Sequence, residues 1–438
     1  MYFFSSPHAH TQTRPGRVHP TPMFHSIDLF SGLGGNAYAF RSFATPMMYC
    51  EKDTHVTPVL KAAILNGHIP WAPLHNDVTT LIEHSSVYKA VKHKRPLLVS
   101  GSWPCQGNST LGKRLGMEDH RSGLLRTLCD VILDCTPDVF FTENVPAAAV
   151  NGSFAYMLET LGTEYEIVGT YVRAQDLGFM HERKRFFCVG LKRDTPRGAA
   201  TASRALVAAM HPIVEPMTRL LPERIEPPRT MYERPHSLNN ALHTLGNAVV
   251  PASSYFAFLK LTGLPIAGLR GENVLATLTF DPSVYTPLAK VKRNTERQTT
   301  ERITQPKISA LWATPRASAL TACHVLTQRS IKDLATQVRF EVGTPHTERA
   351  WYLSHEWVAW LMGYPTSYTR GLGEEDPDAD EARAATLRWA IRHGLDALVV
   401  PTLKKITNIK DIRDALKLAK EVDNSSIVAL IRASLEGD

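Results

Sequence analysis

Short apolar runs alternate with amphipathic segments over the first 192 residues. The apolar runs predict buried strands at 25–30, 46–50, 71–75, 96–99, 138–142, 166–173 and 185–191. The amphipathic segments predict helices at 36–43, 55–66, 123–134 and 154–161. Strands that alternate with helices are typical of an α/β fold with a mostly parallel sheet.

The pattern changes after residue 192. Residues 196–236 are rich in Pro and Arg and predict a loop region or a small irregular domain. An apolar helix at 253–261 indicates a return to the first domain, and further helices are predicted at 382–391, 409–422 and 426–435. We therefore expect a disordered tail at 1–24, a main domain at 25–192, a short insert at 193–240, a return at 241–263 and a C-terminal extension at 264–438.

Composition adds modest constraints. The 438 residues carry 49 Lys and Arg against 42 Asp and Glu, a net charge of +7 that permits binding to a polyanion. No apolar run is long enough to span a membrane. The six cysteines lack paired metal-ligand spacing, which favours a reducing cytoplasm and no metal site: Cys50, Cys105, Cys129, Cys135, Cys188 and Cys323.

A cysteine follows the strand predicted at 96–99, in the stretch Ser100-Gly101-Ser102-Trp103-Pro104-Cys105-Gln106. Ligands of open α/β sheets bind at the carboxyl ends of strands. Pro104 stiffens the backbone before the thiol, which indicates that Cys105 is presented as a nucleophile. A buried structural cysteine is the alternative that the loop alone leaves open.

A glycine turn, Ser31-Gly32-Leu33-Gly34-Gly35, follows the first strand. Strand, glycine turn and helix form the opening unit of nucleotide-binding folds. Glu51 after the second strand is placed to accept hydrogen bonds from ribose hydroxyls, and Asp77 after the third to meet an adenine amino group. An ordinary turn and solvated loop charges remain the alternatives.

Charged residues also end the later strands. Glu143 ends the strand beside the one that leads to Cys105, so its carboxylate is expected to enter the same crevice. Arg183 and Arg185 occupy alternate positions, which predicts that they share one face of an extended segment. A loop charge and a solvated strand end are the alternatives.

Five stretches, in order, resemble the motifs of the cytosine-C5 DNA methyltransferase family: Asp28–Gly35, Pro104–Gln106, Glu143–Val145, Gly178–Gly190 and Gly246–Pro251. The resemblance covers residues 25–262. It implies a Rossmann-like α/β methyltransferase fold with a mixed, mostly parallel sheet, a small target-recognition insert and a C-terminal extension. Two departures are Ser102-Trp103, where the family often has smaller residues or proline, and Met180-His181, where Pro-Gln is common.

The resemblance also implies the chemistry, with S-adenosyl-L-methionine as methyl donor. Its expected contacts are Phe30, Gly32, Gly34, Gly35, Glu51, Asp77 and Asn247. The expected catalytic residues are Cys105, which adds to C6 of cytosine and so makes C5 nucleophilic, Glu143 at N3 and Arg183 at O2. A stacked base is out of reach, so the base is expected to flip out, and the loop 113–122 to close behind it.

The expected partner is double-stranded DNA in the cytoplasm, with a cognate restriction endonuclease as a further partner of a restriction-modification enzyme. The same chemistry on RNA, and a non-catalytic DNA-binding regulator on this scaffold, stay open as alternatives. A nicotinamide-dependent oxidoreductase would share the first turn and Glu51, but it has no need of Pro104-Cys105-Gln106.

The extension carries two further features. Trp312–Arg316 and Glu356–Pro365 resemble segments of methyltransferases borne by phages and prophages. Because the insert is short, we expect residues 264–370 to complete a DNA cleft with basic side chains: Lys290, Lys292, Arg293, Arg297 and Arg302. A packing domain that only covers the main domain is the alternative, and the aromatic residues at 351–368 fit a core better than a base-stacking platform.

Overall fold

A computed structural model describes residues 23–104, 123–220, 227, 230–231, 238–267, 315, 334, 352–365, 367–369, 379–406 and 408–436. Several expectations fall outside these residues. They concern the N-terminal tail up to residue 22, Cys105, the loop 113–122 and the basic side chains between 290 and 302.

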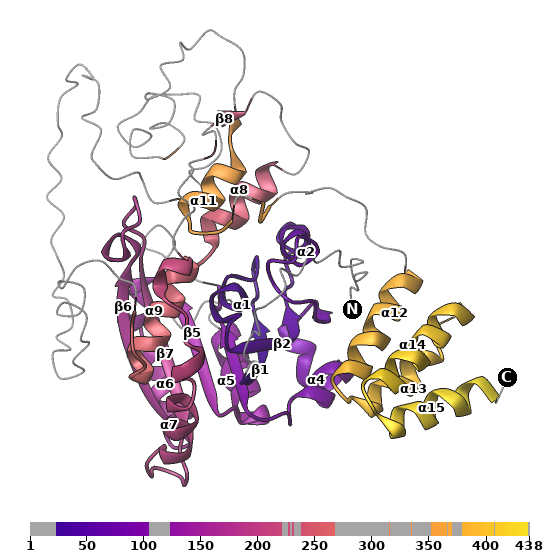
Figure 1. Cartoon of the computed structure of the whole chain (residues 1–438). Helices are drawn as coiled ribbons and strands as arrows, with labels where there is room; N and C mark the ends of the chain where they lie inside the picture. Colours follow the sequence, from indigo (N-terminus) through magenta and orange to yellow (C-terminus); the bar gives the residue numbers. More distant parts are fainter. Residues whose placement is uncertain are drawn as a thin grey trace, which may run out of the picture.

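A seven-stranded sheet in the order β3-β2-β1-β4-β5-β7-β6 forms the centre of the protein (Figure 1). Its strands are β1 (Phe24–Leu29), β2 (Ala44–Cys50), β3 (Leu74–His75), β4 (Leu97–Gly101), β5 (Val139–Asn144), β6 (Tyr165–Arg173) and β7 (Lys184–Lys192). β1 to β5 pair in parallel, and β7 runs antiparallel to both β5 and β6. The mixed, mostly parallel α/β sheet predicted from the sequence is confirmed.

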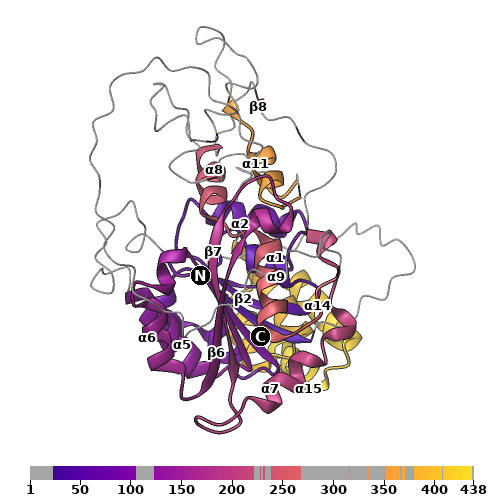
Figure 2. The same ribbon diagram turned by 90° about the vertical axis from the view of Figure 1, so that its left-hand side faces the viewer.

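Helices cover both faces of the sheet (Figure 2). The helices of this part are α1 (Gly35–Phe40), α2 (Thr57–Leu65), α3 (Leu81–His84), α4 (Ser86–Val91), α5 (Gly123–Cys135), α6 (Ser153–Leu161), α7 (Thr201–Ala208), α8 (Leu238–Asn247) and α9 (Pro251–Thr262). On one face Phe40 of α1 meets Phe141 edge-on at 5.0 Å, and Phe258 of α9 packs beside it. On the other face α4, α5 and α6 pack against Val99 and Phe140. Alternating residues of the strands thus enter two different cores, as the period of a strand requires.

The chain crosses the sheet at its centre. From β1 it winds outward through β2 to β3, and then returns to β4 on the other side of β1. Ligands of such sheets bind outside the carboxyl ends of the strands at this switch point. Antiparallel β7 begins at that same edge, since Asn144 at the end of β5 pairs with Phe186 near the start of β7. The fold therefore gathers the residues after β1, β2, β4 and β5 and before β7.

A segment far along the chain packs above this edge. β9 (Tyr352–Leu353) pairs with β8 (Thr230–Met231), and α11 (His355–Leu361) lies beside α8 in both views (Figures 1 and 2). The aromatic residues there are buried: Trp357, Trp360, Tyr364 and Tyr368. The expectation that these aromatics form core is confirmed. Neither α7 nor α8 was anticipated in the irregular stretch, and α8 crosses the expected boundary at residue 240.

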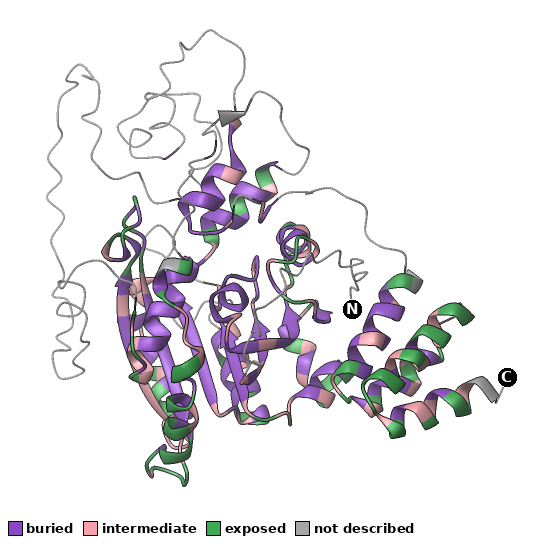
Figure 3. Cartoon of the chain, in the orientation of Figure 1, coloured by how far each residue is buried: buried purple, intermediate pink, exposed green. Residues whose placement is uncertain are grey.

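The last helices form a bundle at the β3 edge: α12 (Ala379–Arg392), α13 (Asp396–Leu403), α14 (Ile409–Glu421) and α15 (Ser425–Glu436). Trp389 meets Trp71 edge-on at 6.2 Å, and Lys94 Nζ donates to the carbonyl of His393 at 2.8 Å. The outward faces of the bundle are largely exposed (Figure 3). In the described part of the chain, no helix combines the length and apolar character needed to cross a membrane.

Candidate active site

The turn after β1 has an unusual backbone that exposes one of its glycines. Phe30, Gly32 and Gly34 have positive φ of 50°, 56° and 84°. Ser31 ties the turn to β2, because its N–H donates to Cys50 O at 2.9 Å and its hydroxyl accepts from Cys50 N–H at 3.0 Å. A Cβ placed on Gly32 would find its nearest described atom, Phe30 O, only at 4.0 Å. As far as the described residues show, the turn therefore leaves room for close approach at Gly32.

Glu51 lies against this turn. Its carboxylate accepts hydrogen bonds from the N–H groups of Gly32 and Asp53, both at 2.8 Å. Burial raises the pKa of Glu51, although these two N–H groups act in the opposite direction. Each carboxylate oxygen has a second lone pair, so Glu51 keeps acceptor capacity for a ligand. The structure thus brings Gly32 and Glu51 together, and Phe30, half-buried beside them, packs on the core under α4 and α5.

Gly34 and Gly35 meet protein rather than open space. A Cβ on Gly34 would lie 2.5 Å from Ile69 Cδ1, and a Cβ on Gly35 would lie 2.5 Å from Tyr364 Oη and 2.6 Å from Val249 Cγ1. The N–H of Gly34 also donates within the turn, to Ser31 O at 2.8 Å. The space that a side chain would take at these two positions is thus filled by neighbouring residues.

Asp77 lies beyond β3 and caps a short 3-10 helix. Its carboxylate accepts from Thr79 N–H and from Thr79 Oγ1, and it pairs with Lys52 Nζ at 2.7 Å. Burial acts against ionisation, but Lys52 and Thr79 outweigh it and hold the pKa of Asp77 below its usual value. Asp77 therefore lies at the same edge of the sheet as Glu51. Its ionised carboxylate already accepts hydrogen bonds from Thr79 and Lys52.

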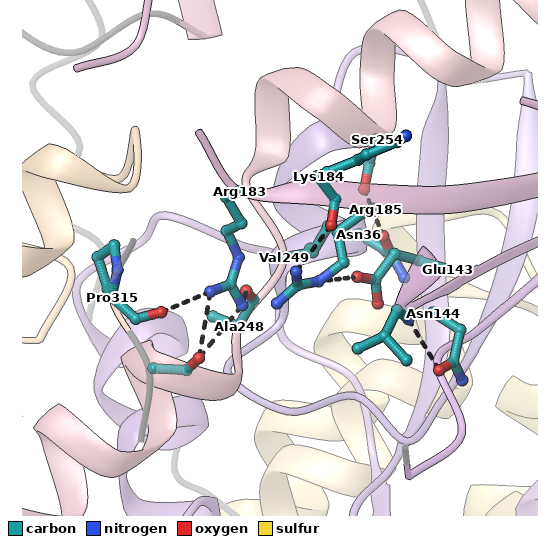
Figure 4. Close-up of polar contacts among 12 residues, drawn as sticks. Asn36, Glu143, Asn144, Arg183, Lys184, Arg185, Ala248, Val249, Ser254 and Pro315 are labelled. Carbon is teal, nitrogen blue, oxygen red and sulfur yellow. Dashed lines mark hydrogen bonds and ion pairs between the residues drawn. The ribbon is translucent and has the colours of Figure 1, made fainter. Parts of the chain in front are cut away.

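Glu143 and Asn144 end β5 on the other side of the switch point. Glu143 is buried and pairs with Arg185, whose Nε lies 3.0 Å from Oε1 (Figure 4). Asn144 donates from Nδ2 to Trp103 O at 2.9 Å and accepts from Val145 N–H at 2.8 Å. Asn144 thereby anchors the chain two residues before Cys105 beside the Glu143 carboxylate.

The two arginines have different partners, and Arg183 lacks the extended conformation that the expectation of a shared face assumed. Arg183 has φ of 25°, which breaks the extended backbone. Its buried guanidinium donates to the carbonyls of Gly246, Ala248 and Pro315, whereas Arg185 turns to Glu143 (Figure 4). Arg183 therefore fixes the loop after α8, and Arg185 is the arginine that our sequence reasoning missed beside Glu143. Arg185 stood in the same motif, but only the partner at the end of β5 distinguishes it.

Asn247 is exposed at the end of α8, between Gly246 and Ala248, whose carbonyls are two of the three in the described residues that accept from Arg183. Its position is thus fixed through the backbone of its neighbours.

The described cysteines are poor nucleophile candidates. Cys50, Cys129, Cys135 and Cys188 are buried, and burial raises the pKa of each thiol. A buried thiol with a raised pKa supplies almost no thiolate near neutral pH. Two of the six cysteines lie outside the described residues, and of these Cys105 follows β4 and the Asn144 anchor.

One acid at this edge went unnoticed in the sequence. Asp28 in β1 is 1% exposed and accepts a 2.5 Å hydrogen bond from Ser100 Oγ of β4. Its other oxygen, Oδ2, has no hydrogen-bond partner among the described residues. Those residues also contain no group of three or more His, Cys, Asp or Glu side chains arranged to hold a metal ion.

A comparison with family models identifies one family for this chain. A family model described as C-5 cytosine-specific DNA methylase matches residues 24–376. The type II methyltransferase M.CviJI of Paramecium bursaria Chlorella virus IL3A is 25% identical over 398 residues, which are 81% of this chain and 100% of that protein. The type II methyltransferase M.NgoBI of Neisseria gonorrhoeae is 29% identical over 180 residues, 40% of this chain and 52% of that protein. Among solved structures, S. pombe Dnmt2 methyltransferase is 17% identical with a TM-score of 0.32, over 46% of this chain and 62% of that one.

Proposed function

The chain belongs to the C-5 cytosine-specific DNA methylase family and is a DNA (cytosine-5-)-methyltransferase, and on that premise we propose how its residues carry out the reaction. The methyl group passes from S-adenosylmethionine to C5 of a cytosine in double-stranded DNA, through a covalent adduct on Cys105. The observation that carries this proposal is the Glu143–Arg185 pair at 3.0 Å, in which Glu143 lies on β5, the strand beside the one that leads into Cys105, and Arg185 lies on β7.

Cytosine C5 is a poor nucleophile, and the thiolate of Cys105 changes this by adding to C6. The addition places negative charge on N3 and O2 of the ring. The Glu143 carboxyl is the partner for N3. Arg185 replaces Arg183 as the partner for O2, since the Arg183 guanidinium is engaged by backbone carbonyls. C5 then attacks the methyl group, whose bond to the donor sulfur breaks, so that S-adenosylhomocysteine is the leaving group. Loss of the C5 proton to solvent and of the thiolate from C6 then releases 5-methylcytosine.

The methyl donor fits the turn after β1. Gly32 is open to close approach and Glu51 stands beside it with spare lone pairs for ribose hydroxyls. Phe30 and Asp77 border the same edge, and Asn247, exposed at the end of α8, is assigned as a further contact of the donor. When bound there, S-adenosylmethionine supplies the electrophilic methyl group at the switch point, between Glu51 and Glu143.

The remaining steps concern the DNA. The target base flips out of the duplex to reach Cys105, and the loop 113–122, outside the described residues, closes behind it. The protein acts in the cytoplasm, and a cognate restriction endonuclease is the partner that would make it half of a restriction-modification pair.

A mechanism-based trap tests this proposal. Duplex DNA carrying 5-fluorocytosine at the target should form a denaturation-resistant adduct with the wild-type protein, because no C5 proton can leave. Cys105→Ser should form none, while it still binds S-adenosylhomocysteine. An adduct that persists in Cys105→Ser would refute the role of Cys105, and methyl transfer to RNA but not to duplex DNA would refute the substrate. Bisulfite sequencing of host DNA, with and without expression, then locates the methylated sequence.

A further inference from the structure

Two buried tyrosines reach the glycine turn from more than three hundred residues along the chain. Tyr368 Oη donates to Leu33 O at 2.9 Å, and Tyr364 Oη donates to Val249 O at 2.7 Å. Both side chains are almost completely buried, with 0% and 1% exposure. The Tyr368 hydroxyl thus satisfies a carbonyl of the glycine turn, and the Tyr364 hydroxyl satisfies a carbonyl of the loop after α8. Both segments border the proposed donor site.

The double glycine of the turn admits these hydroxyls. Any Cβ at Gly35 would lie 2.5 Å from Tyr364 Oη, and one at Gly34 would lie 3.4 Å from Tyr368 Oη. A distance under about 3 Å forces one group to move. Gly35 and Tyr364 are therefore fitted to each other, whereas at Gly34 the group that excludes a side chain is Ile69 and Tyr368 Oη is only in contact distance.

The tyrosine rings are held in turn by their surroundings. The ring centroids of Tyr364 and Tyr368 lie 4.7 Å apart, and the ring of Tyr38 in α1 meets that of Tyr368 edge-on, with 5.5 Å between centroids. The ring of His68 stacks on Tyr368 at 5.1 Å, and its Nε2 lies 3.0 Å from Ser367 Oγ. Aromatic packing of this kind leaves each hydroxyl little freedom.

The same segment contacts the catalytic side of the edge. The carbonyl of Leu361, at the end of α11, accepts from His181 Nε2 at 3.0 Å, two residues before Arg183. Burial and the charge of Arg183 lower the pKa of His181 to about 3, so the ring is neutral and donates through Nε2. Residues 352–365 and 367–369 thus connect three parts of the site: the glycine turn, the loop after α8 and the segment that leads through His181 into β7.

The structure assigns Tyr364 and Tyr368 a role as positioning residues for the methyl donor, through the backbone of the glycine turn and of the loop after α8. The Leu33 carbonyl and the N–H of Gly34 belong to one planar peptide unit, so a hydrogen bond that fixes the carbonyl also fixes the N–H. That N–H donates to Ser31 O within the glycine turn. Without the hydroxyl this buried carbonyl has no other hydrogen-bond partner among the described residues, and the turn relaxes to find one. The assignment rests on the proposed function, since it concerns the site where S-adenosylmethionine binds.

Phenylalanine variants separate positioning from general stability. Tyr368→Phe and Tyr364→Phe keep the ring packing and remove one hydrogen bond each. Tyr165→Phe is the matched control, because Tyr165 is 1% exposed and its hydroxyl donates to Pro137 O at 3.1 Å, at the opposite edge of the sheet. Calorimetric titration with S-adenosylhomocysteine, melting temperature and steady-state kinetics are measured for all four proteins.

We expect Tyr368→Phe to bind S-adenosylhomocysteine roughly tenfold more weakly and to raise KM for the donor more than it lowers kcat. Tyr364→Phe should follow in the same direction, and Tyr165→Phe should keep wild-type affinity even if its melting temperature falls. Wild-type affinity in both test variants, beside a wild-type protein that binds, would overturn this assignment alone. Absence of binding by the wild-type protein would overturn the proposed donor site and this assignment with it.

Discussion

A buried carboxylic acid at the centre of the sheet should set part of the pH dependence of stability. Burial raises the pKa of Asp28 to about 7, the hydroxyl groups of Ser100 and Ser31 oppose this shift, and the charge of Glu51 adds to it. Asp28→Asn removes the ionisable proton and keeps an acceptor for Ser100 Oγ. The variant therefore resembles the protonated acid at every pH.

The sign and size follow from proton linkage. Between pH 3.8, the value for a free aspartate, and about 7, the folded protein holds a proton that the unfolded chain has released. The free energy of unfolding thus falls as pH rises through this window, by about 1.4 kcal/mol per pH unit and about 4 kcal/mol in all. Well above pH 7, Asp28 is ionised in both the folded and the unfolded chain, and its proton no longer contributes to the free energy of unfolding. At pH 8 the Asp28→Asn variant should be more stable than wild type by that amount, less about 1–3 kcal/mol for an amide N–H that finds no acceptor.

Urea unfolding at pH values between about 5 and 8 measures this difference, since the other titrating groups cancel between variant and wild type. Asp134→Asn is a control of opposite sign. Burial acts against ionisation of Asp134, but the Tyr88 hydroxyl and Lys92 outweigh it and lower its pKa, so this variant should lose stability at pH 8. An Asp28→Asn protein whose stability falls with pH as steeply as wild type would refute the reasoning.

Three further outcomes are expected. Arg185→Ala should lower kcat by about a hundredfold while binding of S-adenosylhomocysteine stays near wild type, because the guanidinium pairs with Glu143 and not with the donor turn; unchanged kcat would contradict this. Gly35→Ala should destabilise the protein in thermal unfolding. Adding Tyr364→Phe to the same chain should recover part of this loss, because it removes one of the two groups that clash with the new Cβ. Strictly additive effects of the two substitutions would count against the fit between Gly35 and Tyr364. Trp389→Ala should cost about 3–5 kcal/mol where the C-terminal bundle packs on the main domain, and limited proteolysis should then cleave before α12 while methyl transfer persists; a resistant linkage would show that other contacts hold the bundle.

Local pattern was enough for the elements of the sheet. Runs such as Leu97-Leu98-Val99 are apolar because both faces of a parallel strand are covered, so they are visible in the sequence without any partner. Parallel strands also share one direction, and the residue after each strand must lie at the same edge. That is why Glu51 beside the glycine turn could be anticipated from the order of residues, as could Glu143 on the strand next to the one that leads to Cys105.

Partners that are distant in the sequence were decided by the tertiary structure alone. Arg183 and Arg185 are alike in their local sequence, and only the carbonyls of the loop after α8 and the carboxylate on β5 give them different tasks. Gly34 and Gly35 matched a cofactor motif, yet the atoms that exclude a Cβ there come mainly from other parts of the fold. Desolvation depends on everything that packs around a group, so the raised pKa of Asp28 had no local signal, although its strand was expected to be buried.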